Sequence, residues 1–161
     1  MKLIPKPVEL VEAPLDGQYA FTELKAPTSG DIFLHQVVKD DGTGTATLAT
    51  GTDTTGFYLA LSDTSPTLKQ GSSDSTSLGE VGFLASRPDK VRVVPLSGKK
   101  AIISAKGKLS STHIGAQFGL LQEGRYTVLD LSNATKAAAK VLEVVEGEVG
   151  DEYARVLVQF N

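Results

Sequence analysis

The stretch that decides the fold is the last third of the chain, Thr112–Asn161. It reads HIGAQFGLL from His113, QEGRYTVLDL from Gln122, KVLEVVE from Lys140 and YARVLVQF from Tyr153. Every second residue of the final run is apolar, namely Ala154, Val156, Val158 and Phe160. One fully apolar side is typical of a strand that lines a core. The glycine-containing loops 122–124 and 147–152 favour hairpins between successive strands.

The residues upstream favour the same fold class. Asp40-Asp41-Gly42 lies between two strand-like runs and predicts a hairpin. The run 32–38 is apolar on both faces, which predicts a mostly buried strand. In NATKAAAK, Ser132 or Asn133 can cap a helix of about two turns, because Ala and Lys favour helix. We therefore expect an all-β protein, a small barrel or sandwich of short antiparallel strands with an extended N-terminal arm and at most one short helix.

The chain divides into three regions by composition. Residues 1–14 contain Pro5, Pro7 and Pro14, which predicts an extended arm rather than a helix. Residues 15–86 form a turn-rich β region, in which the Ser, Thr and Gly-rich stretch 62–79 predicts a mobile loop. Residues 87–161 are expected to form a C-terminal β-barrel-like domain.

The composition of the chain argues against several classes of function. The 161 residues carry a net charge of −3, so the basic footprint of a nucleic-acid binder is missing. No apolar run approaches the roughly 20 residues of a membrane span, so we expect neither nucleic acid nor membrane as a partner. The chain has no cysteine, which excludes disulfides and thiolate chemistry. Pro5, Pro7 and Glu9 interrupt the apolar run that a signal peptide would need.

Residues able to support chemistry are few. His35 and His113 lie in strand patterns without carboxylates at metal-ligand spacing, so structural roles are expected. Asp40, Asp41 and Asp53 could gather around Ca²⁺, but the EF-hand order is missing and turn formation is the favoured interpretation. No nucleophile elbow or phosphate loop is present. We expect no enzyme, no cofactor and no metal.

Charge is distributed unevenly along the chain. The segment 87–108 carries seven bases against Asp89, namely Arg87, Lys90, Arg92, Lys99, Lys100, Lys106 and Lys108. The segment 143–152 carries five acids and no base, namely Glu143, Glu146, Glu148, Asp151 and Glu152. One interpretation is a set of solvated loops. The other is a dipolar surface suited to head-to-tail packing between copies.

The C-terminal sequences GRYTVLDLSNATKAA (124–138) and KVLEVVEGEVGDEYARVLVQF (140–160) also carry a family resemblance. Over roughly residues 91–161 the chain resembles the decoration, or cement, proteins of tailed bacteriophages. The resemblance implies a short barrel without catalysis or cofactor, assembled in the host cytoplasm. It also implies binding to the major capsid protein on the outer surface of the virion capsid, often as a homotrimer.

The residues expected to contact the capsid or a neighbouring subunit come from the arm and from the charged turns. They are Lys2, Ile4, Pro5, Pro7, Lys99, Lys100, Glu146 and Glu148. Two alternatives stay open: a tail, baseplate or fibre-associated β module, and a carbohydrate-binding β domain. The second is weakened by the absence of Trp and the presence of only four Tyr, since glycan binders usually expose aromatic platforms.

Overall fold

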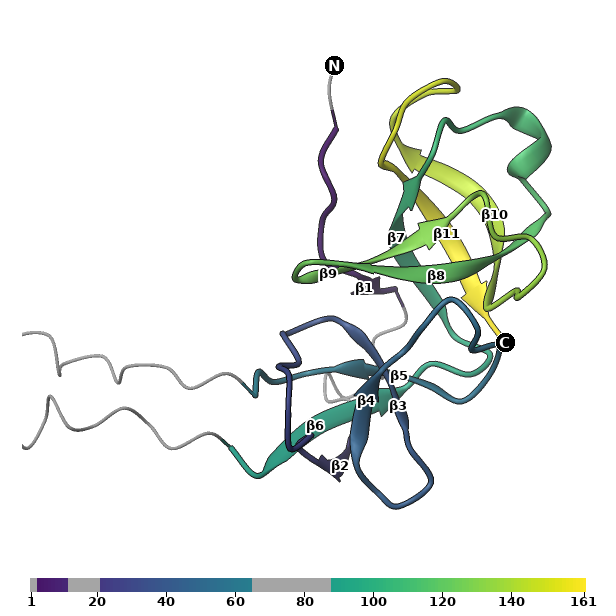
Figure 1. Ribbon diagram of the computed structural model, residues 1–161. Coiled ribbons are helices and arrows are strands. Elements are labelled where there is room, and N and C mark those ends of the chain that lie inside the picture. The colour runs from purple at the N-terminus through teal and green to yellow at the C-terminus, as the bar shows by residue number, and fades with distance from the viewer. Residues whose placement is uncertain (1–2, 12–20, 65–87) are drawn as a thin grey trace, which may run out of the picture.

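The computed structural model describes residues 3–11, 21–64 and 88–161. The chain is nearly all β, and two sheets pack as a small β-sandwich, which confirms the expected fold class (Figure 1). The strands are β1 Glu9–Leu10, β2 Thr22–Lys25, β3 Val37–Asp40, β4 Ala46–Leu48, β5 Phe57–Ala60, β6 Lys90–Pro95, β7 Lys100–Lys106, β8 Gln117–Glu123, β9 Tyr126–Asp130, β10 Ala139–Glu146 and β11 Ala154–Phe160. A 3₁₀ turn, η2, spans Ser111–His113.

The first sheet is built mainly from the C-terminal third. Its strand order is β1-β7-β11-β10-β8-β9, and β7 also pairs in parallel with β9, with Ala105 opposite Leu129. This extra pairing closes the five strands β7, β11, β10, β8 and β9 into a barrel. Closure removes most of the open edges that the sheet would otherwise have. The strand β1 of the N-terminal arm is added outside that ring, on β7.

The second sheet has the order β2-β6-β5-β3-β4. A parallel bridge between Lys25 and Thr45 brings its two edge strands together, and the Lys25 amide donates to the Gly44 carbonyl at 2.8 Å. The sequence boundary at residue 87 falls just before β6, and β6 pairs with β2 and β5 in this second sheet. Sheet membership therefore changes at the turn between β6 and β7.

Both faces of the second sheet are apolar, as expected for buried strands. On one face Val38, Ala60 and Val93 join a small core enclosed by the curl of the sheet. On the other face Phe57, Leu59 and Val94 join the main core with the residues of the barrel. Phe57 and Phe160 meet edge to face at 5.8 Å between ring centroids, which couples the two sheets directly.

The alternation in the last strand is confirmed. Ala154, Val156, Val158 and Phe160 are all buried in the main core. The three predicted hairpins are also present, β3 to β4, β8 to β9 and β10 to β11. In the middle one Gly124 has a φ of 59°, the left-handed conformation that its loop position requires.

The predicted helix after Ser132 is wrong, because no helix forms between Leu131 and Ala138. The Asn133 carbonyl accepts from the Gly119 amide, and the Ala138 amide donates to the Phe118 carbonyl, both at 2.8 Å. The backbone groups that a helix would use are therefore bonded to β8. Tertiary pairing overrides the intrinsic helix preference of this segment.

The predicted strand 32–38 is shorter than expected, because β3 begins only at Val37. The residues before it leave the sheet at His35, which has a φ of 66°, a strained value for a residue other than glycine. The turn is held by the Gln36 amide, which donates to the Phe33 carbonyl at 3.1 Å. Ile32 and Gln36 are buried, whereas Leu34 is exposed.

Candidate interaction site at the arm and the acidic end of the barrel

The N-terminal arm, defined here as residues 3–11, lies on the chain's own barrel. Glu9 and Leu10 pair with Ile102 and Ala101 of β7, and the Val11 amide donates to the Lys100 carbonyl at 3.2 Å. Val8 is fully buried in the main core. An extended proline-containing segment thus gains order from one short strand pairing and one buried apolar anchor.

The start of the arm reaches the hairpin tip between β10 and β11. Leu3 packs so closely on Gly147 that a Cβ at that glycine would lie 2.9 Å from Leu3 Cδ1. Gly147 also has a φ of 100°, a backbone conformation that favours glycine. The turn therefore requires glycine for its conformation, and the contact with Leu3 requires the absence of a side chain. The tip lies at the end of the barrel remote from the C-terminus (Figure 1). Ile4, the residue after Leu3, is 64% exposed.

A charged cluster fixes the arm over β11. The Arg155 side chain is only 5% exposed, lies 3.2 Å from Glu9 and 3.9 Å from Glu146, and donates to the Pro7 carbonyl at 3.3 Å. Lys6 pairs with Glu146 at 2.9 Å. Two bases and two acids therefore meet at the arm, which offsets the cost of burying the guanidinium. Both acids of this cluster are paired with bases, so the cluster holds the arm against the barrel.

Arg155 is the residue of this site that sequence reasoning missed. Its place in the alternation of β11 put it on the side away from the core. That side is covered because the arm crosses it, and a crossing between residues almost 150 positions apart leaves no local signal in the sequence. The only available hint was an arginine set among apolar residues in YARVLVQF.

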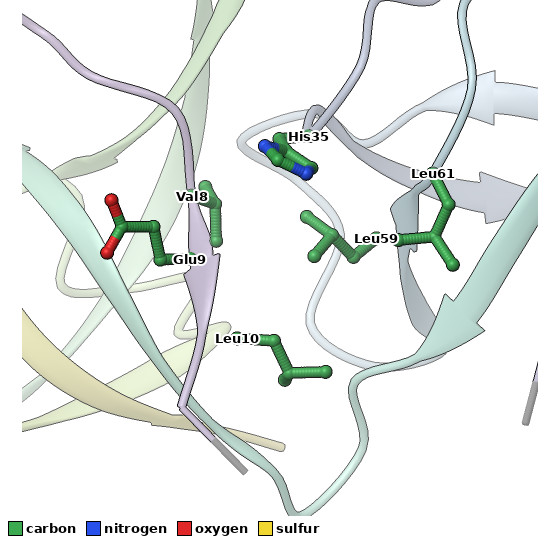
Figure 2. Close-up of a pocket in the computed structure, with 6 residues that line it drawn as sticks. All are labelled: Val8, Glu9, Leu10, His35, Leu59 and Leu61. Atoms are coloured by element: carbon green, nitrogen blue, oxygen red, sulfur yellow. The ribbon is translucent and has the colours of Figure 1, made fainter. Parts of the chain in front are cut away.

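A cavity of about 300 Å³ lies between the arm and the second sheet. It is lined by Val8, Glu9, Leu10, His35, Leu59 and Leu61. Figure 2 shows Val8 and Leu10 on the side facing Leu59, whereas the carboxylate of Glu9 points away from it. Four of the six lining side chains are aliphatic, and the volume is at the small end for a ligand site. The cavity therefore offers mainly aliphatic side chains for contact.

The other predicted contact residues are dispersed. Pro5 is partly buried, Pro7 is exposed, and Lys2 lies outside the described residues. Lys99 and Lys100 are partly exposed at the turn before β7, where the Lys99 carbonyl accepts from the Phe160 amide at 3.0 Å. This turn is therefore beside the C-terminus, at the end of the barrel opposite to Glu146 and Glu148.

The basic segment does not form one surface. Lys100 pairs with Gln159 at one end of β11, whereas Ala105, next to Lys106, pairs with Ala154 at the other end. Lys106 therefore lies near the acidic tip, where it binds Glu123 at 2.7 Å. Within the segment 87–108, the barrel residues Lys99 and Lys100 lie at the end opposite the acids whereas Lys106 does not, so this segment contributes less to a dipole than the sequence suggested. Arg87 and most of the predicted mobile loop 62–79 lie outside the described residues.

Glu123 links Lys106 to Tyr153 beneath the acidic tip. The Tyr153 hydroxyl donates to Glu123 Oε1 at 3.0 Å, and Lys106 donates to the same oxygen. The hydrogen bond to Glu123 raises the pKa of Lys106 above its ordinary value. It also raises the pKa of Tyr153, with a further contribution from burial. Both groups are therefore held in their protonated forms.

The aspartates near the glycine turns accept hydrogen bonds from backbone amides of their own turns. Asp41 Oδ1 accepts from the Thr43 hydroxyl at 2.6 Å and from the Thr43 amide at 2.8 Å, and these bonds lower the pKa of Asp41. Burial alone would raise the pKa of Asp53, but bonds from Thr50 and Lys39 outweigh it and lower the pKa. In the described part of the chain no three His, Asp or Glu residues are grouped to hold a metal ion.

The two histidines have structural contacts. The His35 amide donates to the Ala60 carbonyl at 2.8 Å. His113 Nδ1 accepts from the Ser110 amide at 3.0 Å and caps η2, while its ring packs edge to face on Phe118. Neither imidazole is hydrogen-bonded to a carboxylate within the described ranges.

No family model matches the chain, and no curated protein or solved structure matches it either. Among the residues that are described, no helix is long and apolar enough to cross a membrane.

Proposed function

We propose that the chain is a virion structural protein that binds the outer surface of a phage capsid and stabilises it by bridging capsomers, without catalysis. Its partners would be the major capsid protein and other copies of itself, in a homotrimer assembled in the host cytoplasm. The resemblance of residues 91–161 to phage decoration proteins supports this function, and the all-β fold is compatible with it. A decoration protein can act through many shallow contacts, because a lattice repeats its binding sites.

The observation that carries the proposal is the chemistry of the two ends of the barrel. At the tip of the β10–β11 hairpin Val145 and Val149 are 48% and 64% exposed, beside the exposed acid Glu148. Ile4 is presented at the same end, because Leu3 packs on Gly147. Exposed apolar side chains gathered at one end are typical of a protein-binding surface. Lys99 and Lys100 at the opposite end can meet the acids of a neighbouring copy.

The role proposed for the arm follows from where it lies. Its β1 backbone is already paired with β7 of the same chain, so the arm is not required to add a strand to a neighbour's sheet. Its exposed side chains include Ile4 and Pro7, which remain available to a partner. We therefore assign the arm's contact to those side chains.

Charge reversal at the turn before β7 tests the self-association. The double variant K99E/K100E should lower the trimer fraction measured by light scattering and weaken its salt dependence, because it reverses the charge of two lysines at the end opposite the acidic tip. The matched control K25E/K90E reverses two exposed lysines of the second sheet and should leave assembly unchanged. Unchanged assembly and salt dependence in K99E/K100E would show that the charged ends do not meet.

Co-sedimentation with capsids tests the partner. The purified chain should sediment with expanded capsids and less with unexpanded ones, because expansion creates the outer surface to which a decoration protein binds. Isolated tails are the control for a tail or baseplate module. A monomer that stays in the supernatant with expanded capsids would contradict the proposal, and sedimentation with tails alone would replace it by the tail function.

A further inference from the structure

The strand β10 has one edge that the rest of the described chain leaves largely open. Its inner edge pairs with β11 along the whole strand. Its outer edge pairs with β8 only at Ala139 and Lys140, and Val141 is bonded to Gly115 and Ala116. Beyond Val141, no described residue forms a backbone hydrogen bond with the outer edge of Leu142–Glu146. Unpaired N–H and C=O groups of this kind are a template for another strand.

The same residues interrupt the regular register of β10. The pairing with β11 shifts between Val141 and Glu143 and again between Val144 and Glu146. Each shift leaves one extra residue, Leu142 and Val145, in the manner of a β-bulge. Such irregularities twist an edge and prevent indiscriminate pairing with long strands. A short, specific segment can still bond to the backbone between them.

The side chains around this edge define what it would accept. Val145 and Val149 are exposed and offer apolar contact. Glu143, Glu148 and Glu152 are exposed acids, and none of them forms a salt bridge with a described residue. The paired acid, Glu146, is already neutralised by Lys6. Excess negative charge beside exposed valines favours a segment that alternates basic and apolar residues.

We propose that the outer edge of β10 at Leu142–Glu146 binds a short, extended, lysine- or arginine-bearing segment of another protein as an added strand. The backbone of the edge supplies hydrogen bonds, Val145 and Val149 contact the apolar side chains, and Glu143 and Glu148 pair with the bases. The inference does not depend on the capsid as partner, because it rests only on the pairing and chemistry of the edge.

The proposal is tested with a peptide of alternating lysine and valine whose two termini are blocked. The peptide should bind the intact chain in a fluorescence anisotropy titration and slow amide exchange specifically at 142–146. Two control peptides separate the contributions. A glutamate–valine peptide should not bind, and a lysine–valine peptide N-methylated at alternate amides should bind at least about tenfold more weakly, because it cannot complete the strand.

The variant E143K/V145K places two lysines on the edge and should weaken peptide binding by about tenfold or more through charge repulsion and lost apolar contact. The matched control E23K reverses an exposed acid on β2 of the other sheet and should leave binding unchanged. The folding of each variant is checked by comparing its backbone amide NMR spectrum with that of the unchanged protein. Equal binding of the N-methylated peptide, or protection that maps elsewhere, would overturn the proposal. Concentration-dependent protection of 142–146 without peptide would overturn it in favour of a second copy as the occupant.

Discussion

The guanidinium of Arg155 is held beneath the arm by two carboxylates and one carbonyl. Its contacts with Glu146 and Glu9 span the arm and the β10–β11 hairpin, so removing either acid leaves a buried cation with fewer partners. Breaking such a pair costs more than an exposed pair is worth, although Glu146 is 38% exposed and solvent screens part of its effect.

The variant E146Q should therefore lower the free energy of unfolding by about 1–2 kcal/mol, because it removes a partner of both Arg155 and Lys6. E148Q is the matched control, since Glu148 is two residues away and its side chain is exposed. Urea denaturation of both variants gives the comparison. If E146Q and E148Q unfold at the same urea concentration, the charged cluster does not hold the arm.

The contacts of Glu123 predict a loss of stability at high pH. The pKa values of Lys106 and Tyr153 are raised in the folded protein, so folding favours their protonated forms. The contribution to stability is complete below their ordinary pKa values of 10.5 and 10.0 and is lost as pH rises through the folded values. Thermal unfolding measured between pH 8 and about pH 11 should show this loss, and E123Q should flatten it. An equally steep loss in E123Q would assign the pH dependence to other groups.

At the scale of elements, the arm is a strand added to a closed barrel. Val8 anchors it in the main core, whereas Ile4 is presented to solvent at the acidic end. These two side chains therefore separate the folding role of the arm from its proposed binding role.

We expect V8A to lower the stability by about 1–2 kcal/mol, because a fully buried valine loses apolar contacts. It should also speed amide exchange at Ile102, the partner of Glu9 on β7. I4A should change neither quantity. Equal, negligible effects of V8A and I4A would indicate that the arm is detached from the barrel in solution.

The elements also show what could be predicted from sequence. Alternation in β11 and glycine-containing loops are local signals, so the last strand and the hairpins were predictable. The parallel pairing of Ala105 with Leu129 and the crossing of Pro7 over Arg155 join distant segments and have no such signal. The helix expected after Ser132 failed for the same reason, because its backbone is bonded to β8. Ile4 and Glu148 lie at the same end of the barrel, and their contact with a partner stays a prediction.

At the scale of the whole molecule, the two sheets share one main core and present two different ends. The acidic end combines Ile4, Val145 and Val149 with exposed acids, and Lys99 and Lys100 lie at the other end. The proposed contacts with a capsid surface and with other copies are assigned to these two ends. The open edge of β10 lies beside the acidic end and would add a second mode of contact there.

The most direct test of the capsid proposal compares the intact chain with the variant I4D/V149D in co-sedimentation with expanded capsids. Both side chains are exposed, so the variant should fold normally, while two acids in place of two apolar contacts should weaken capsid binding by about tenfold or more. Strong sedimentation of the intact chain and loss of sedimentation in the variant are the predicted results. Equal sedimentation of the two proteins, or no sedimentation of either, would contradict the proposal that this end of the barrel binds the capsid.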